Sequence, residues 1–210
     1  MKNIDFIKAQ SVVKALNKNE FDASFIETKE EAINKIMDLI PDKSKVGIGG
    51  SMTIKELKLE MYIASKNCDI YNILQKGLSQ VEMLRVREEQ LKSDVFLTSS
   101  NAITKKGELV NIDNSGNRVT AMTFGPSRII VVAGINKITT NLDTAIDRVK
   151  NHAAPKISSY FGFKTPCAET GFCNNCTAPI TICRTVSIIR AKPRAVKNYN
   201  VIIIGEHLGY

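Results

Sequence analysis

A long run of β-branched residues constrains the fold of this 210-residue chain more than any other feature. The run RIIVVAGINKI begins at residue 128, and NVIIIGEHLGY forms another such run at residues 200–210. The first run is typical of a central strand that is buried on both faces of a sheet. Predicted strands alternate with predicted helices along the chain. This alternation indicates an α/β fold with a mostly parallel sheet flanked by helices.

Turn and capping residues place further elements. Thr28 and Ser79 each begin a capping box that starts a helix, and Asn141 is expected to cap a helix that ends before Pro155. The segment DVFLTSSNAIT is expected to be a strand that ends in a polar cluster. Residues 114–117, Asn-Ser-Gly-Asn, carry the chemistry of a tight turn and predict an antiparallel hairpin.

The chain is expected to form one main domain with an N-terminal addition. Residues 1–42 are predicted to be a helical segment packed on the domain, and residues 43–210 form the domain itself. The domain includes a cysteine-rich loop at residues 165–184.

Composition limits the classes of partner. The net charge is +8, but lysine and arginine are scattered, tryptophan is absent, and no nucleic-acid module is recognisable. We therefore expect a small anionic ligand, a carboxylate or a phosphate, and no nucleic-acid partner. No apolar run approaches the roughly 18 residues of a membrane span. The N-terminus also lacks the apolar core of a signal peptide, so a cytoplasmic protein is expected.

A glycine-rich turn is the first candidate ligand site. The segment VGIGGSMT places Gly47, Gly49 and Gly50 at the end of a strand, with Ser51 and Thr53 at the start of the next helix. Glycines let backbone N–H groups approach an anion, and hydroxyl groups add further donors. The spacing matches neither a Walker A loop nor a dinucleotide-binding loop. The alternative is a tight corner in which Ser51 is an ordinary helix cap.

Two more polar clusters follow predicted strands. Asn101 belongs to the first and Glu206 to the second, and both are expected to line the same crevice. Glu206 is the candidate catalytic acid or base. The alternative is that these residues only cap or solvate loops. The two histidines, His152 and His207, give no basis for a catalytic triad.

The cysteine-rich loop carries the most specific chemistry. Its cysteines have the spacing C-x5-C-x2-C-x6-C, at Cys167, Cys173, Cys176 and Cys183. Disulfides are disfavoured in a cytoplasmic protein, so the cysteines are predicted to be metal ligands. Four thiolates suit an iron–sulfur cluster, such as a 4Fe–4S cluster, or a structural zinc ion. Oxidation-sensitive thiols and a site shared with a partner are the remaining alternatives.

These motifs together resemble the lactate utilization protein family, whose defining unit is the LUD domain. The resemblance rests on SSNAITKKGELVNIDNSGNRVTAMTFGPSRIIVVAGINKI, on PCAETGFCNNCTAPITICR and on VIIIGEHLGY, and it covers the chain from about residue 44 onward. It implies a fold related to CoA-transferases and ribose-5-phosphate isomerase, in which a glycine-rich turn binds an anion. It also implies a part in an assembly that oxidises L-lactate to pyruvate. One component of that assembly has a separate ferredoxin-like segment, whereas this chain resembles a stand-alone LUD protein with its own cysteine loop.

The leading hypothesis is therefore an accessory redox or ligand-binding component in the oxidation of L-lactate or a similar small carboxylate. It implies a redox protein partner, and a homo-oligomer is also expected. If the protein is an enzyme, it belongs to an oxidoreductase system for lactate or a related small anion. The alternatives are a non-redox enzyme like a CoA-transferase or sugar-phosphate isomerase, and a ligand-sensing module with structural zinc. A transferase would need a glutamate nucleophile, for which Glu108 and Glu206 are the candidates.

Overall fold

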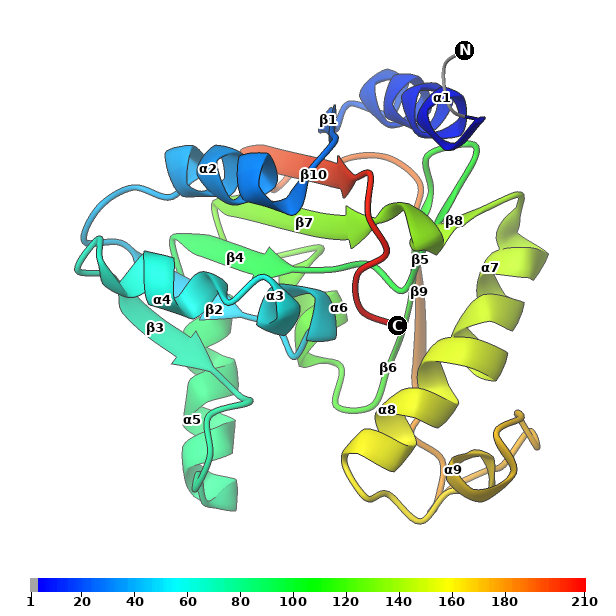
Figure 1. The fold of residues 1–210 in the computed structure, drawn as a ribbon. Helices are drawn as coiled ribbons and strands as arrows, with labels where there is room; N and C mark the ends of the chain where they lie inside the picture. The colour runs from blue at the N-terminus through cyan, green and yellow to red at the C-terminus, as the bar shows by residue number, and fades with distance from the viewer. Residues whose placement is uncertain (1–3) are drawn as a thin grey trace.

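The protein is described by a computed structural model that covers residues 4–210 and shows two β-sheets (Figure 1). The larger sheet has six parallel strands in the order β1-β10-β7-β4-β2-β3, and the smaller has four in the order β8-β5-β6-β9. The larger sheet consists of β1 (Asp22–Ile26), β2 (Lys45–Ile48), β3 (Asp69–Asn72), β4 (Val95–Thr98), β7 (Arg128–Gly134) and β10 (Asn198–Ile204). The smaller consists of β5 (Ala102–Thr104), β6 (Leu109–Asp113), β8 (Ile138–Thr139) and β9 (Thr185–Ile189). The α/β prediction with a mostly parallel sheet is thus confirmed.

The two β-branched runs pair with each other inside the larger sheet. Strands β7 and β10 are aligned from Arg128 beside Asn198 to Gly134 beside Ile204. Alternate residues of β7 enter different cores: Ile129 and its like-facing neighbours join one apolar cluster, and Ile130 and its neighbours join another. Both faces of the sheet are therefore buried, which explains why the strand sequence is apolar without alternation.

Helices cover both faces of the larger sheet. Helix α1 packs with the first cluster, and α2, α3 and α4 pack with the second. The helices before β7 are α1 (Ile4–Lys18), α2 (Lys29–Leu39), α3 (Met52–Glu56), α4 (Leu59–Ala64), α5 (Gln80–Leu91) and α6 (Asn117–Ala121). After β7 come η1 (Ile135–Lys137), α7 (Leu142–Arg148), η2 (Val149–Ala153), α8 (Ala154–Tyr160) and α9 (Pro166–Thr170). Within residues 4–210, no helix combines the length and apolar character needed to cross a bilayer.

The N-terminal segment contains a strand as well as the predicted helices. Between α1 and α2, residues 22–26 form β1, which adds a parallel strand beside β10. The segment DASFI has only one buried position, because β1 lies at the edge of the sheet. Edge strands need no continuous apolar run, so the pattern gave no strand signal here.

The predicted hairpin at residues 114–117 is wrong. Strand β6 ends at Asp113, and the chain then enters helix α6. The Asp113 carboxylate accepts hydrogen bonds from the backbone N–H groups of Arg118 and Val119, so it caps the helix that the turn residues precede. An antiparallel pair does occur earlier in the chain, between the consecutive strands β5 and β6.

The helix that Asn141 caps does not end before Pro155. It continues from α7 through the π-helical segment η2 into α8 and ends at Tyr160. Pro155 directly follows the π-helical segment, where the α-helical hydrogen-bond pattern is already interrupted. This long helical run connects the smaller sheet to the cysteine-rich loop (Figure 1).

Candidate functional site

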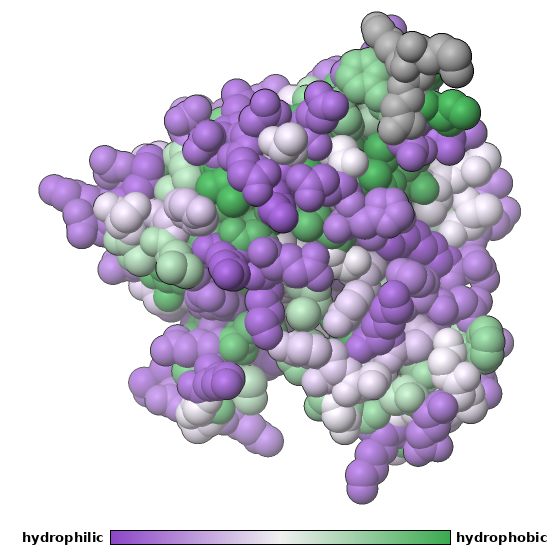
Figure 2. Space-filling view, in the orientation of Figure 1, coloured by the Kyte–Doolittle hydropathy of each residue, from purple (hydrophilic) through white to green (hydrophobic). Residues whose placement is uncertain are grey.

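A cavity of about 290 Å³ lies at the carboxyl ends of three neighbouring parallel strands. Residues 50–51 follow β2, residues 99–101 follow β4, and Lys137 follows β7. Open α/β sheets bind ligands at this edge. The opposite wall includes Met83 of α5 and Ile157 of α8. In Figure 2 the surface is hollowed between the lobes formed by these two helices. The volume is close to the lower limit for small-molecule sites.

Lys137 is the most unusual residue of this cavity. It is only 3% exposed, and its Nζ donates to Thr53 Oγ1 at 2.8 Å and to Ser99 Oγ at 2.9 Å. Burial, together with the smaller effects of the cations Arg148 and Arg118, lowers the pKa of Lys137 from 10.5 to about 7, while Glu56 opposes this shift. A large shift caused by burial in a cleft is a property of functional residues.

A second buried cation, Arg118, organises the polar wall of the cavity. Its guanidinium donates to the side-chain oxygens of Asn111 at 2.6 Å and Asn101 at 2.9 Å. It also donates to the backbone oxygens of Ser99 and Ile112, each at 3.1 Å. Asp113 completes the network with an ion pair at 3.6 Å. Arg118 therefore ties the loop after β4 to strand β6.

The three glycines of the predicted turn have different surroundings. A Cβ at Gly47 would lie 2.9 Å from Ser93 Oγ, and one at Gly49 would lie 2.9 Å from both Phe96 Cζ and Thr98 Oγ1. These two glycines thus allow close packing beneath the turn. Only Gly50 lines the cavity. A Cβ there would meet the Ile73 Cδ1 atom at 3.1 Å.

The hydroxyl and amide residues predicted for the site fall into two groups. Ser51 and Asn101 line the cavity, and Thr53 reaches it through its hydrogen bond to Lys137. Ser51 Oγ also accepts from the backbone N–H of Ile54, so it caps α3 as the structural alternative predicted. The structure therefore brings Gly50, Ser51, Thr53 and Asn101 to one place.

Glu206 lies apart from this group. Its carboxylate accepts from the backbone N–H of Lys29 at 2.8 Å, at the start of α2, and it does not line the cavity. Glu108 is buried in the smaller sheet and accepts from Thr104 Oγ1 at 2.8 Å. Neither glutamate is positioned by the structure to meet a ligand held at Lys137.

The cysteine-rich loop borders the same cavity through one residue. Cys183 is among the cavity-lining residues, together with Gly50 and Lys137. Cys167 is buried and lies 3.2 Å from Thr165 Oγ1, whereas Cys173 and Cys176 are half-buried. Burial raises the pKa of the Cys183 thiol, and the other three cysteines of the loop raise it further. The four thiols thus lie within electrostatic reach of each other.

The four thiols of the loop are of a type that binds metal ions, but in this structure they do not lie close enough together to share one ion. Four thiols on one loop suit tetrahedral ligation of zinc or of an iron–sulfur cluster. Among residues 4–210, however, no three Cys, His, Asp or Glu side chains lie close enough together to hold a metal ion. Metal binding by these thiols therefore requires a shift of the loop that draws them together.

Comparison with known proteins identifies the family. Residues 9–204 match the LUD domain family. The chain belongs to this family. The match confirms the resemblance to lactate utilization proteins, and it includes most of the N-terminal segment as well as the main domain. No curated protein matches the chain.

A solved structure shares the fold of this LUD domain. It is a DUF162 family protein from Deinococcus radiodurans, with a TM-score of 0.55 and 13% sequence identity. The similarity covers 97% of this chain and 99% of the other. At this identity the likeness concerns the arrangement of helices and strands.

Sequence reasoning missed the two buried cations of the LUD domain. Lys137 occurs in the apolar segment AGINKI directly after a buried strand, and this position was the available signal. The sequence placed Arg118 in the second strand of the predicted hairpin, so its part in the cavity was not recognised.

The charged side chains of the cavity wall are three cations, Arg87, Arg118 and Lys137, and one carboxylate, Asp113. Asp113 pairs with Arg118, so Arg87 and the protonated form of Lys137 remain to attract an anion.

Proposed function

We propose that this LUD-domain protein binds a small carboxylate, such as lactate or its oxidation product, and is an accessory component of a redox system. The cysteine-rich loop would carry an iron–sulfur cluster. One observation carries the proposal: Cys183 of the loop lines the same cavity as the glycine turn and the buried Lys137. A cluster bound by this loop would border the ligand site instead of serving as a remote structural staple.

The charges of the cavity support an anionic ligand. Arg87 and Lys137 have no ion-pair partner within residues 4–210, and both line the cavity. A carboxylate beside Arg87 would offset charge that the protein leaves unpaired, and the protonated fraction of Lys137 would add to this attraction. The apolar side of the cavity, which includes Ile157 and Phe161, suits a short aliphatic chain.

The four thiols support the redox part of the proposal. Burial raises the pKa of the Cys183 thiol, the other three cysteines raise it further, and a bound cation would stabilise the thiolate form. A bound iron–sulfur cluster would supply a one-electron carrier. The chain's own residues would hold the ligand and keep water from it. An electron-carrying protein would be the partner.

Metal content after anaerobic purification tests this proposal. We expect about four irons per chain and a broad visible absorption, as for a 4Fe–4S cluster with cysteine ligands. Cys173→Ser should remove the iron, because one of four ligands is lost. Cys68→Ser is the matched control: Cys68 lies beside Ser44 and Pro41, outside the loop, and its replacement should leave the iron in place.

Two other results would contradict parts of the proposal. About one zinc per chain without colour would indicate a structural site, which favours the non-redox enzyme or the ligand sensor. Iron that survives Cys173→Ser would contradict the ligand set.

A further inference from the structure

Lys137 has a hydrogen-bonding arrangement that few lysines share. Its Nζ has two hydroxyl neighbours, Thr53 and Ser99, and no carboxylate of residues 4–210 forms an ion pair with it. Buried lysines are usually neutralised by an acidic partner. This one is held by neutral groups alone.

Lys137 is the donor in both hydrogen bonds, because each hydroxyl group uses its own hydrogen elsewhere. Thr53 Oγ1 donates its own hydrogen to the backbone oxygen of Leu208 at 3.4 Å, and Ser99 Oγ donates to that of Ser100 at 3.3 Å. Both hydroxyl oxygens therefore accept from Lys137. A neutral amine has two hydrogens, and these two acceptors use both of them. The remaining tetrahedral position of Nζ holds the lone pair.

The electrostatic surroundings favour that neutral form. Burial and the nearby guanidinium groups of Arg148 and Arg118 bring the pKa of Lys137 to about 7, against the smaller opposing effect of Glu56. Near neutral pH a large fraction of Lys137 is therefore the free amine, whereas an exposed lysine is almost entirely protonated. Desolvation next to other cations is a known way to activate a lysine nucleophile.

We propose that Lys137 forms an imine with the carbonyl group of a small 2-oxo acid bound in the cavity. This inference rests on the proposed function, since loss of two electrons and two protons from a 2-hydroxy carboxylate gives a 2-oxo acid. The Nζ lone pair attacks the carbonyl carbon, and the carbonyl π electrons move to its oxygen. The oxygen then leaves as water with the two hydrogens of the amine, and a C=N bond remains.

The cavity provides for the other parts of such a ligand. Arg87 is an unpaired cation for the carboxylate, and its Nε has no hydrogen-bond partner within residues 4–210. Ser51 and Asn101 line the same cavity and offer polar groups to the ligand. Ile157 and Phe163 form an apolar wall for a short alkyl group. An alcohol such as lactate offers the amine no carbonyl carbon, so covalent capture distinguishes the oxo acid from the hydroxy acid.

Reductive trapping tests this inference on the whole chain. We would incubate the protein with pyruvate and sodium cyanoborohydride, and then measure intact mass and map the modified peptide. The expected result is one adduct per chain on Lys137, and none when lactate replaces pyruvate. Lys137→Met should lose the adduct. Lys55→Met, which removes an exposed lysine of neighbouring helix α3, should keep it.

A second variant separates covalent capture from simple attraction of charge. Lys137→Arg keeps a cation but lacks the amine, so it should bind pyruvate in calorimetry and form no adduct. An adduct spread over surface lysines, or one retained in Lys137→Arg, would overturn the inference. Because the wild-type adduct is mapped directly, the result stands even if a variant folds poorly.

The same measurements distinguish the two proposals. If the wild-type protein binds pyruvate in calorimetry but gives no adduct, the imine inference fails and the proposed ligand site stands. If lactate, pyruvate and inorganic phosphate all fail to bind, the proposed ligand site itself fails.

Discussion

The two polar parts of the cavity differ in how firmly the protein holds them. On the strand side, Arg118 donates four hydrogen bonds to oxygen atoms, and Lys137 donates two. On the loop side, Cys183 lines the cavity, and behind it the Cys167 thiol contacts Thr165 Oγ1 and the Cys173 thiol contacts Asn175. No hydrogen bond to the Cys176 thiol occurs within residues 4–210. The strand side is thus organised by a dense hydrogen-bond network, whereas the thiols of the loop side have few hydrogen-bond partners. Three experiments test this difference: replacement of Arg118, the pH dependence due to Lys137, and proteolysis of the cysteine-rich loop.

Replacement of Arg118 should produce the largest effect. Arg118→Met removes the buried cation that pairs with Asp113 and donates to four oxygen atoms, so we expect a loss of about 3–5 kcal/mol in the free energy of unfolding. Chemical denaturation measures this loss. Arg87→Met is the matched control, because Arg87 lines the same cavity but its Nε has no partner, and it should cost less than about 1 kcal/mol. Equal losses in the two variants would show that the network does not organise this wall.

The protonation of Lys137 should give a smaller, pH-dependent effect. The pKa of Lys137 is about 7 in the folded protein and 10.5 in its ordinary state, so between these values the unfolded chain binds a proton that the native state has released. Stability from this group therefore increases as pH rises through that range, and it is lost as pH falls. The slope reaches about 1.4 kcal/mol per pH unit.

Denaturation curves of the wild type and of Lys137→Met, measured at about pH 7, 8 and 9, test this slope. The wild type should gain stability relative to the variant as pH rises. Lys55→Met should follow the wild type, since Lys55 is exposed. Parallel curves for the wild type and Lys137→Met would contradict a lowered pKa at this site.

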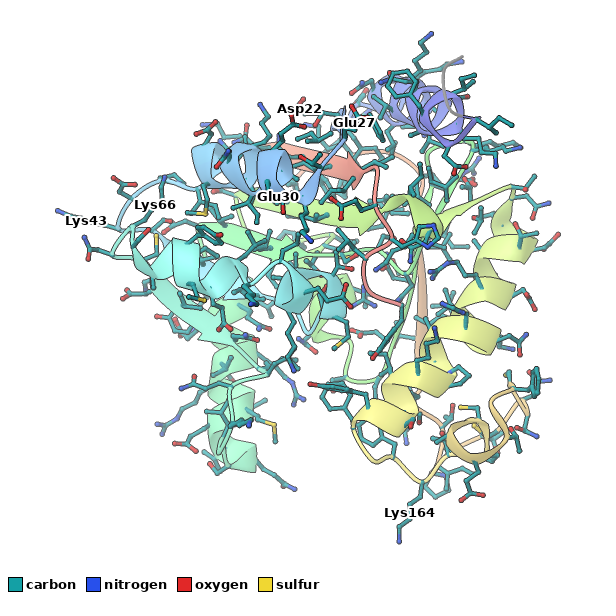
Figure 3. The ribbon with its side chains drawn as sticks, in the orientation of Figure 1. Asp22, Glu27, Glu30, Lys43, Lys66 and Lys164 are labelled. Atoms are coloured by element: carbon teal, nitrogen blue, oxygen red, sulfur yellow. The ribbon has the colours of Figure 1, made fainter. Side chains whose placement is uncertain are left out.

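The smallest effect concerns the cysteine-rich loop alone. If the loop holds the metal proposed above, its removal with a chelator should loosen the loop and make trypsin cleavage at Lys164 and Arg184 several-fold faster, a local change of about 1 kcal/mol. Lys43 is an internal control. It points into solvent far from the loop, as Figure 3 shows for both Lys43 and Lys164. Peptide mass spectrometry over time gives the rates. Equal acceleration at Lys43 would indicate general unfolding instead.

The sequence predicted the parts of the fold that local patterns determine. The β-branched runs at residues 128–134 and 198–204 became adjacent central strands, because burial on both faces leaves an unbroken apolar pattern. The capping box at Ser79 is present, Asn141 caps its helix as expected, and Thr28 caps α2 by accepting a hydrogen bond from the backbone N–H of Glu31. Strand β1 was not predicted, because an edge strand with one neighbour carries no such pattern.

The site was less predictable because its chemistry depends on tertiary contacts. The glycine turn was recognised from its residues, yet only the structure shows that Gly47 and Gly49 pack beneath the turn while Gly50 lines the cavity. Lys137 carries no motif: its lowered pKa comes from burial and from arginines on two distant helices. Glu206 follows a predicted strand but turns toward α2, which no local pattern reveals.

The three loops that follow β2, β4 and β7 each contribute a separate set of groups to the cavity. The strands themselves contribute mainly to the apolar core beneath. Mutations in one loop can therefore change one contact with the ligand while the sheet and the other two loops are inherited unchanged. Lys137 links the three loops through its hydrogen bonds to Thr53 and Ser99, so substrate preference can diverge among descendants of one ancestor in small steps at positions outside these bonds.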